Sequence, residues 1–338
     1  MRLLRPILAF LASIILTLLG LLAVTFVIGR VIPIDPVLAV VGDRASPQTY
    51  AAARAAMGFD LPLYQQFLIY LKNVLSGNFG QSTLTGRPVL EDIKAFFPAT
   101  IELSSVAIVV GVGLGVPLGV LAGVRSGRWP DHLVRLFGLV GYSAPVFWLG
   151  LVGLLIFYAK LDWVGGPGRL DIYYDGLIEP RTGLLLLDSL LAGDTEVFWN
   201  AVSHIVLPAS ILAWYSMAYL SRMTRSFVMA EMKQEYVMTA RIKGMSECRV
   251  IWRHVMGNVA VPLVTVVALS YGGLLEGSIL TETVFAWPGL GRYITESLFN
   301  ADMNAVLGGT IVVGVCYILL NLLSDLVYRL LDPRAHAA

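Results

Sequence analysis

Residues 100–124 read TIELSSVAIVVGVGLGVPLGVLAGV, an apolar run in which Glu102 is the one charged side chain. About 20 mostly apolar residues in a helix span the hydrocarbon core of a bilayer. Four glycines of this run recur at every fourth position, namely Gly111, Gly115, Gly119 and Gly123. This spacing puts them on one helix face, where another helix can approach closely. The stretch therefore predicts a membrane-spanning helix that packs through a glycine face.

Five further stretches are apolar enough to cross a membrane. They cover residues 7–28, 133–160, 204–221, 259–281 and 306–331. Arg2 and Arg5 precede the first stretch, as in a secretion signal, but the run is long for such a signal and no small-residue cleavage pattern follows it. We interpret it as a retained span. The sequence therefore predicts an all-α polytopic membrane protein with six transmembrane helices.

The composition of the whole chain supports residence in a membrane. Of its 338 residues, 57% are hydrophobic and 14% charged, and the mean hydropathy is +0.75. Soluble domains carry about 25% charged residues. These values exclude a disordered or an ordinary soluble protein. Two cysteines, Cys248 and Cys316, are too few for a disulfide scaffold of this size.

The distribution of charge predicts the orientation. With the N-terminus inside, the inner parts hold 14 Lys and Arg against 6 Asp and Glu, and the outer parts hold 10 against 17. Inner loops of membrane proteins are enriched in Lys and Arg. Both termini are therefore expected to be cytoplasmic, and nucleic acid is not an expected partner, because the basic residues lie where a membrane protein places them.

Two loops have helical patterns of their own. In the outer segment 29–99, Ser46 and Pro47 predict the start of a short helix that ends at Gly58, and a second is predicted over residues 63–75. The inner segment 222–258 is far longer than the 2–8 residues typical of bundle connections. Its pattern predicts a helix over residues 229–243 that ends at Gly244, followed by a helix capped by Ser246. We interpret this segment as an element that docks on a partner.

Residues 235–264, EYVMTARIKGMSECRVIWRHVMGNVAVPLV, also carry a family resemblance. Glu235, Ala240 and Gly244, followed by Pro262, resemble the EAA signature of bacterial ABC-importer permeases, with Glu-Tyr-Val in place of Glu-Ala-Ala. Further motifs along the whole chain resemble the dipeptide/oligopeptide subfamily: IPIDP (32–36), GNFGQS (77–82), PATIEL (98–103), GYSAPVFW (141–148), HIVLP (204–208), RMTRS (222–226), ETVFAWPGLG (282–291) and DPR (332–334).

The resemblance implies a type I ABC importer permease architecture. It implies an N-terminal span with an external helical segment over residues 1–97, a permease domain over 98–331 and a coupling loop at 222–258 with a cytoplasmic coupling helix. That helix seats in an ATPase subunit in the family. The residues expected to couple to it are Glu235, Tyr236, Thr239, Ala240, Arg241, Lys243, Gly244, Met245 and Arg249.

The resemblance also implies partners and a location. The expected partners are a second homologous permease subunit in a heterodimer, two ATPase subunits, an external substrate-binding protein and a short peptide substrate. The expected location is the bacterial inner membrane, with the chain in direct contact with the lipid bilayer. No cofactor is expected in this chain, because it has no GxxxxGK[ST] phosphate-binding loop; ATP and Mg²⁺ are expected on the ATPase subunits.

Few residues are candidates for contact with a substrate. Glu276 lies in the fifth apolar stretch, and an acid within a span is a functional candidate by default. Ser143 and Tyr271 complete the predicted substrate path. His204 has no second histidine or cysteine at ligand spacing, so no metal site is expected, and no catalytic set is expected either.

The sequence thus predicts the permease subunit of an ATP-driven importer of dipeptides or short oligopeptides, and not an enzyme. Three alternatives remain open. One is an importer of the same class for a nickel complex, glutathione or a sugar. Another is an ion-coupled secondary transporter, which would show internal repeats and intramembrane charges. The last is a membrane-embedded enzyme, which would need a cluster of His, Asp or Glu within its spans.

Overall fold

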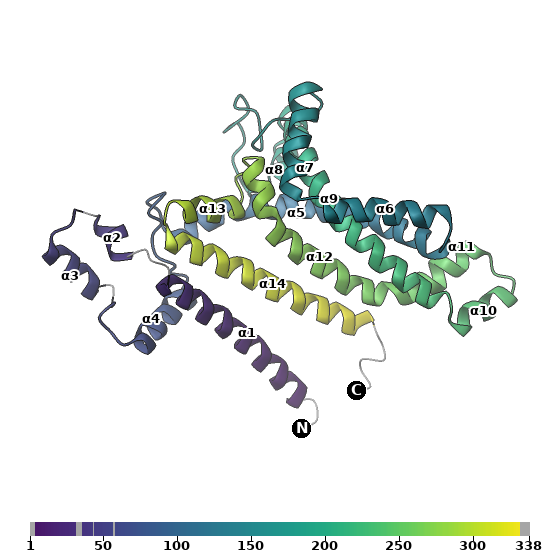
Figure 1. The fold of residues 1–338 in the computed structure, drawn as a ribbon, viewed down its shortest axis with the longest axis horizontal. Coiled ribbons are helices and arrows are strands. Elements are labelled where there is room, and N and C mark those ends of the chain that lie inside the picture. The colour runs from purple at the N-terminus through teal and green to yellow at the C-terminus, as the bar shows by residue number, and fades with distance from the viewer. Residues whose placement is uncertain (1–3, 32–35, 43, 57, 332–338) are drawn as a thin grey trace. The chain divides into compact units, whose positions relative to one another are not determined.

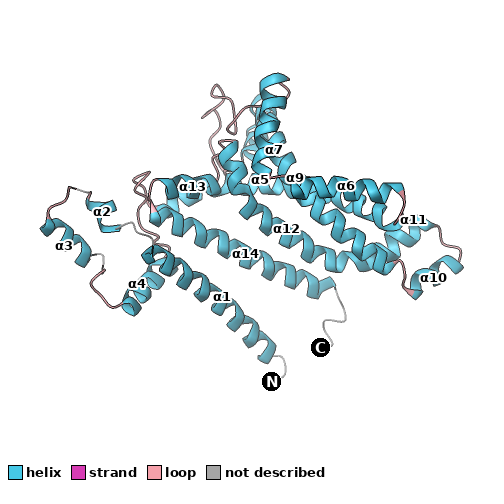
Figure 2. Ribbon diagram, viewed as in Figure 1, coloured by secondary structure: helices cyan, strands magenta, loops and turns pink. Residues whose placement is uncertain are grey.

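The computed structural model describes residues 4–31, 36–42, 44–56 and 58–331, and within these ranges the regular structure is helical apart from one isolated bridge between Gln81 and Pro88 (Figure 2). The DPR motif and residues 32–35 of the IPIDP motif lie outside the described residues. The chain divides into two compact units, of which the first comprises residues 1–97 and 289–318 and the second residues 98–288 and 319–338. The division falls inside two long helices.

In its described residues, the first unit contains five complete helices and parts of two more, labelled in Figure 1. Its complete helices are α1 (Leu4–Val31), α2 (Pro36–Val41), α3 (Pro47–Ala56), α4 (Leu63–Leu75) and α13 (Leu290–Phe299). The start of α5 (Val89–Val124) and the first half of α14 (Met303–Leu331) belong to it as well. The two short helices predicted between Ser46 and Leu75 are confirmed as α3 and α4.

Close approach and aromatic contacts hold the first unit together. A Cβ at Gly314 would lie 2.6 Å from Leu21 Cδ2, so α14 packs directly on α1. Phe26 of α1 also meets Phe67 of α4 edge to face, with 5.4 Å between the ring centres. A separate core joins the start of α5 to α13 and to the start of α14, through the buried residues Val89, Ile93, Leu290, Tyr293 and Ala305.

The second unit is a helical bundle around α9 (Thr195–Glu231), which packs most extensively against α6 (Trp129–Ser143) and α12 (Met256–Val284). It also contains most of α5, α7 (Val146–Gly153), α8 (Leu185–Ala192), α10 (Glu235–Ile242) and α11 (Glu247–Arg249). Two stretches are π-helical: η1 (Leu154–Lys160) continues α7, and η2 (Val250–Val255) joins α11 to α12.

The glycine face of α5 packs on α9 as its spacing predicts. A Cβ at Gly111 would lie 2.7 Å from Ser216 Oγ, and one at Gly119 would lie 2.6 Å from the carbonyl oxygen of Ser221. A Cβ at Gly115 or Gly123 would lie 3.1 or 2.8 Å from the nearest atom of α9, whereas Gly113, outside the four-residue repeat, has nothing within 4 Å. Any side chain at the repeat positions would push the two backbones apart, so the glycines set the distance between these helices.

In the described part of the chain, five helices are long and apolar enough to cross a membrane, and a sixth span is formed if residues 129–160 count as one broken helix. The predicted span over 133–160 is not one straight helix, because the chain bends by 95° between Ser143 and Val146. Pro145 lacks a backbone N–H and disfavours helical geometry in the preceding residue, and Ala144 accordingly adopts an extended conformation.

Two other boundaries differ from the sequence-based expectation. The fourth span extends far beyond residues 204–221, because Asp194 caps α9 by accepting hydrogen bonds from the backbone N–H groups of Glu196 and Val197, each at 3.1 Å. The helix predicted over 229–243 is interrupted: α9 ends at Glu231, a turn covers residues 232–234, and α10 begins at Glu235. An acidic residue in the first turn of a helix is favoured by the helix dipole, which stabilises the new start.

Candidate functional site

The segment between α9 and α12 is a helix–turn–helix held by a glycine. Helix α10 ends at Ile242, Gly244 adopts φ +76°, and Ser246 precedes α11. The turn is clamped by Arg241 and Glu247, whose side chains form two hydrogen bonds of 2.8 and 3.1 Å. Gly244 has nothing within 4 Å of its missing Cβ, so this position requires glycine for its left-handed backbone and not for space.

One face of this segment is part of the bundle core. Val237 and Ala240 of α10 are buried together with Val250 and Val255 of η2 and Val228 of α9. Of the predicted coupling residues, Ala240 therefore lies inside the protein, where it holds α10 on the bundle. Tyr236 and Met245 pack against the same cluster and are half-buried.

The opposite face is open to solvent and bears most of the predicted coupling residues. Glu235, Thr239, Arg241, Lys243, Gly244 and Arg249 are all exposed. The hydroxyl of Tyr236 donates a 2.6 Å hydrogen bond to Glu231, so this side chain fixes the turn between α9 and α10. Burial and the neighbouring carboxylate raise the pKa of Tyr236, which keeps its phenol protonated as a donor.

Three exposed apolar residues on this segment were missed by the sequence analysis. Met238 and Ile242 lie four residues apart on α10, with 67% and 80% of their surface exposed, and Trp252 of η2 is 55% exposed. Residues four apart share one helix face. We call Met238, Ile242 and Trp252 the exposed apolar set. Exposed apolar side chains that share a helix face, as Met238 and Ile242 do, are typical of sites of protein contact.

An ion pair fixes the first turn of α6 to the C-terminal part of α9. The buried carboxylate of Asp131 accepts two hydrogen bonds from Arg225, at 2.5 and 2.8 Å, and a third from the backbone N–H of Gly127 at 2.9 Å. A bidentate arginine–carboxylate pair fixes orientation as well as distance. Arg225 belongs to the RMTRS motif, so this motif has a clear role in holding α6 against α9.

The predicted substrate-path residues do not form one cluster. Ser143 is exposed at the end of α6, where the broken helix bends, and Glu276 is exposed on α12. Tyr271, also on α12, is half-buried and shares a 2.9 Å hydrogen bond with Ser105 of α5. Tyr271 thus joins two helices, whereas the other two side chains are exposed on the surface of the chain.

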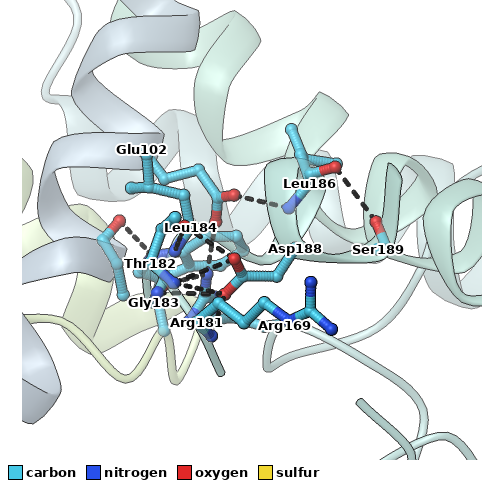
Figure 3. A network of polar contacts seen from close by, with 11 residues as sticks. Glu102, Arg169, Arg181, Thr182, Gly183, Leu184, Leu186, Asp188 and Ser189 are labelled. Atoms are coloured by element: carbon cyan, nitrogen blue, oxygen red, sulfur yellow. Dashed lines mark hydrogen bonds and ion pairs between the residues drawn. The ribbon is translucent and has the colours of Figure 1, made fainter. Parts of the chain in front are cut away.

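A polar network fastens the long loop between η1 and α9 (Figure 3). Glu102 of α5 pairs with Arg169 and accepts a 2.7 Å hydrogen bond from the backbone N–H of Leu186. Arg169 also donates to the carbonyl oxygen of Gly183 at 3.1 Å. Glu102, the one charged side chain of the run 100–124, is thus 5% exposed and anchors this loop.

Asp188 of α8 is a second buried carboxylate in this region, and it stabilises the turn that leads into α8. Asp188 accepts hydrogen bonds from the backbone N–H groups of Arg181, Thr182 and Gly183 and from the hydroxyl of Thr182 (Figure 3). Burial raises the pKa of Asp188, but these donors lower it by more, and the net pKa lies below the ordinary value of 3.8. The ionised carboxylate therefore closes the turn.

The ETVFAWPGLG motif contributes a third buried acid. Glu282 is fully buried and accepts hydrogen bonds from Thr100 at 2.7 Å and Ser278 at 3.0 Å. The indole of Trp287 donates to the carbonyl oxygen of Ala99 at 2.9 Å, and the guanidinium of Arg169 lies 5.7 Å from its ring centre. The motif thus connects α12 to the start of the apolar part of α5.

Among the described residues there is no group of three or more His, Cys, Asp and Glu side chains that could hold a metal ion. His204 is buried and interacts through Nε2 with Asp171 at 3.2 Å. This contact gives the HIVLP motif a structural role in packing the long loop on α9.

Comparisons with known proteins agree over nearly the whole chain. Residues 3–104 match the family of N-terminal regions of binding-protein-dependent transport system membrane components, and residues 115–337 match the family described as binding-protein-dependent transport system inner membrane component. A solved structure of the MetNI methionine ABC transporter in inward-facing conformations has a TM-score of 0.49 and 17% identity, covering 69% of this chain and 93% of its own.

Three relatives illustrate the similarity. The probable D,D-dipeptide transport system permease protein DdpB of Escherichia coli K12 is 42% identical, covering 95% of this chain and 94% of its own. The di/tripeptide transport system permease protein DppB of Pseudomonas aeruginosa UCBPP-PA14 is 40% identical, covering 94% of each chain. The dipeptide transport system permease protein DppB of Escherichia coli K12 is 40% identical over 98% of each chain.

These matches confirm the predicted class of protein: a multi-pass inner-membrane permease subunit, whose family works with ATPase and substrate-binding partners. Its relatives are named as permeases, and none of the three is named as an enzyme. The chain belongs to the family of inner-membrane components of binding-protein-dependent transport systems.

Proposed function

We propose that this chain is one membrane subunit of an ATP-driven importer that moves dipeptides and short oligopeptides delivered by an external binding protein. The observation that carries the proposal is the similarity, over more than nine-tenths of the chain, to three permeases named for the transport of di- or tripeptides. A nickel complex, glutathione or a sugar remains the alternative solute for the same machinery.

The proposed coupling surface is the exposed face of α10 and α11. It combines a rigid glycine turn, charged side chains around it and the exposed apolar set of Met238, Ile242 and Trp252. Because Val237 and Ala240 are buried in the bundle core, a displacement of α10 is passed to α9 and α12. Closure of two ATPase subunits on ATP and Mg²⁺ then shifts the bundle between its outward- and inward-open states, as expected for two conformations biased by a partner.

The proposed orientation places this coupling surface and both termini in the cytoplasm. Seven of the chain's 24 Lys and Arg lie between Arg222 and Arg253, in and beside the coupling segment. Such a concentration of basic residues in one loop favours retention on the inner side. The loop between η1 and α9, which the Glu102–Arg169 network holds on α5, then faces outward, where a binding protein would release the solute.

We further propose that this chain pairs with a second, non-identical permease subunit. Up to six spans make half of a pathway in the architecture that the resemblance implies. Glu276 is exposed on α12 within an apolar helix, and charged residues in spans normally face a bundle interior or a water-filled path. A partner subunit would enclose Glu276, which is then placed to receive the ammonium group of a peptide.

The test is uptake of a labelled dipeptide into vesicles that contain this chain, the second permease, both ATPases and the binding protein. Accumulation is expected with ATP, and none is expected with an ion gradient alone. Uptake driven by an ion gradient without ATP would contradict the proposal and favour a secondary transporter. Turnover of a solute by the purified chain alone would instead favour a membrane enzyme.

The coupling surface is tested separately by the retention of ATPase subunits during purification. Ile242→Ser removes an exposed apolar side chain and Glu235→Arg reverses an exposed charge; both are expected to reduce ATPase retention without lowering the amount of folded chain. Glu179→Arg, an exposed reversal in the loop between η1 and α9, is the matched control and should retain the ATPases fully. Normal retention and uptake in both variants would show that the coupling surface lies elsewhere.

A further inference from the structure

A groove of about 680 Å³ lies between α6 and α9 in the second unit, and neither the coupling surface nor the predicted substrate path includes it. Its walls are apolar along α6, with Leu136, Gly138 and Leu139 among the lining residues. No acidic residue lines the groove. Its polar lining residues are almost all basic or aromatic, and they are His132, Arg135, Tyr142, Ser221, Arg222 and Arg225.

Arg222 is held in this groove by aromatic rings. Its guanidinium carbon lies 5.4 Å from the ring centre of Tyr142 and 5.7 Å from that of Tyr219. Tyr142 in turn stacks on Tyr215 at 5.6 Å with an interplanar angle of 12°. Stacking of this kind orients a guanidinium and leaves its N–H groups free to donate sideways to an anion.

The two arginines that α9 contributes to the groove differ in their partners. Arg225 is neutralised by its bidentate pair with Asp131. For Arg222, no carboxylate lies within ion-pair distance among the residues that the structure describes, and its side chain is exposed. An arginine without a counter-ion at the wall of an apolar groove is free to pair with an anionic group that enters the groove.

The bend beside the groove favours a solute over a membrane lipid. Tyr142 is in the last turn of α6, immediately before the break at Ala144 and Pro145. A broken helix at membrane depth occurs where the chain is covered by protein or lines a water-filled cavity, because lipid cannot satisfy the freed backbone groups. The Tyr142 end of the groove is therefore expected to face a path and not hydrocarbon.

We propose that Arg222, supported by Tyr142 and Tyr219, binds the C-terminal carboxylate of the transported peptide in the groove between α6 and α9. This inference rests on the proposed function. Short peptides with different side chains share only their backbone and two charged ends, so a path that accepts many of them has to recognise these common groups. Guanidinium and carboxylate match in shape and charge, and the exposure of Arg222 keeps binding weak enough for release.

The experiment compares a dipeptide with its C-terminal amide in vesicles containing the complete transporter. The measured quantity is the ratio of the uptake rate of the free acid to that of the amide. All vesicles contain the same binding protein, so a difference in this ratio between wild type and variant is caused by the permease. Arg222→Gln is expected to lower uptake of the free acid about fivefold, the effect of one partly exposed ion pair, and to leave uptake of the amide unchanged. Arg222→Lys should restore part of the loss. Arg128→Gln, which removes an exposed arginine outside the groove, should behave as wild type.

Each other outcome overturns the proposal in a distinct way. Equal loss of acid and amide uptake in Arg222→Gln, or equal loss in Arg128→Gln, would contradict the role of Arg222 while leaving the proposed function intact. A reduced yield of assembled transporter would make Arg222 a subunit contact. Loss of uptake only in vesicles with anionic phospholipid would make the groove a lipid site. Wild-type vesicles that take up no dipeptide would contradict the proposed function itself, and with it the carboxylate at Arg222.

Discussion

Gly244 shows how a single backbone angle can shape a whole docking element. Its φ of +76° is costly for residues with a Cβ, by about 1–2 kcal/mol, although no atom blocks the position. Gly244→Ala is therefore expected to loosen the turn between α10 and α11, and Gly244→Asn should do so less, since Asn tolerates this conformation better. Hydrogen exchange over residues 235–249 measures the effect.

The matched control for Gly244 is Gly257, an exposed glycine near the start of α12 that also has nothing within 4 Å and lies in ordinary helix. Gly257→Ala is expected to leave exchange of the turn unchanged. If Gly244→Ala exchanged no faster than wild type, the turn would not depend on the left-handed conformation of this residue.

Asp188 makes the long loop between η1 and α9 sensitive to acid. Its pKa in the folded protein lies below the ordinary 3.8, so its carboxylate stabilises the loop fully at neutral pH, and this contribution is lost as the pH falls through the folded value. We expect the loop to become accessible to an acid-stable protease below about pH 4. Asp188→Asn should already be accessible at neutral pH and should change little on acidification. An equal response to acid in both proteins would contradict the role of Asp188.

At the scale of helices, the spacing of glycines in α5 leads to a paired prediction. Gly119→Ala would place a Cβ 2.6 Å from the backbone of α9 and is expected to destabilise the bundle by about 1–3 kcal/mol, the usual cost of overpacking. Gly113→Ala meets nothing within 4 Å and should be neutral or stabilising by up to about 1 kcal/mol. Thermal unfolding of the purified chain in detergent compares the two. Similar midpoints for both variants would rule out the glycine face as the contact.

Local sequence was sufficient for features that depend on neighbours along the chain. The apolar runs predicted the spans and the four-residue repeat predicted the glycine face, because both follow from helix geometry alone. The bend at Ala144 and Pro145 also had a local signal, the restriction before proline, but the strong apolarity of residues 133–160 concealed it.

Features that depend on distant partners could not be predicted in this way. Glu102 and Arg169 are 67 positions apart, and no pattern within either segment indicates their pairing. The exposure of Met238 and Ile242 was equally hidden, because an apolar residue on a short helix normally packs inward, and only the packed structure shows that Val237 and Ala240 occupy that side. The coupling face therefore emerged from burial and not from periodicity.

At the scale of the whole molecule, the two native cysteines provide a test of orientation. Cys248 is exposed on α11, whereas Cys316 is half-buried within the apolar part of α14. A membrane-impermeant maleimide is expected to label Cys248 in inverted vesicles washed free of peripheral subunits, and to leave intact cells unlabelled. Cys248→Ser should abolish the labelling, because an apolar helix keeps the reagent from Cys316.

The opposite side of the membrane is reported by a cysteine placed on the loop between η1 and α9. Tyr173 is 80% exposed there, so Tyr173→Cys in the Cys248→Ser background should react in intact cells. The two sites lie on loops separated by one span, α9, and must therefore label from opposite sides. If Cys248 reacted in intact cells, α10 and α11 would face outward. No cytoplasmic ATPase could then reach Gly244 or Ile242, and the coupling surface would have to be assigned to the other face of the bundle.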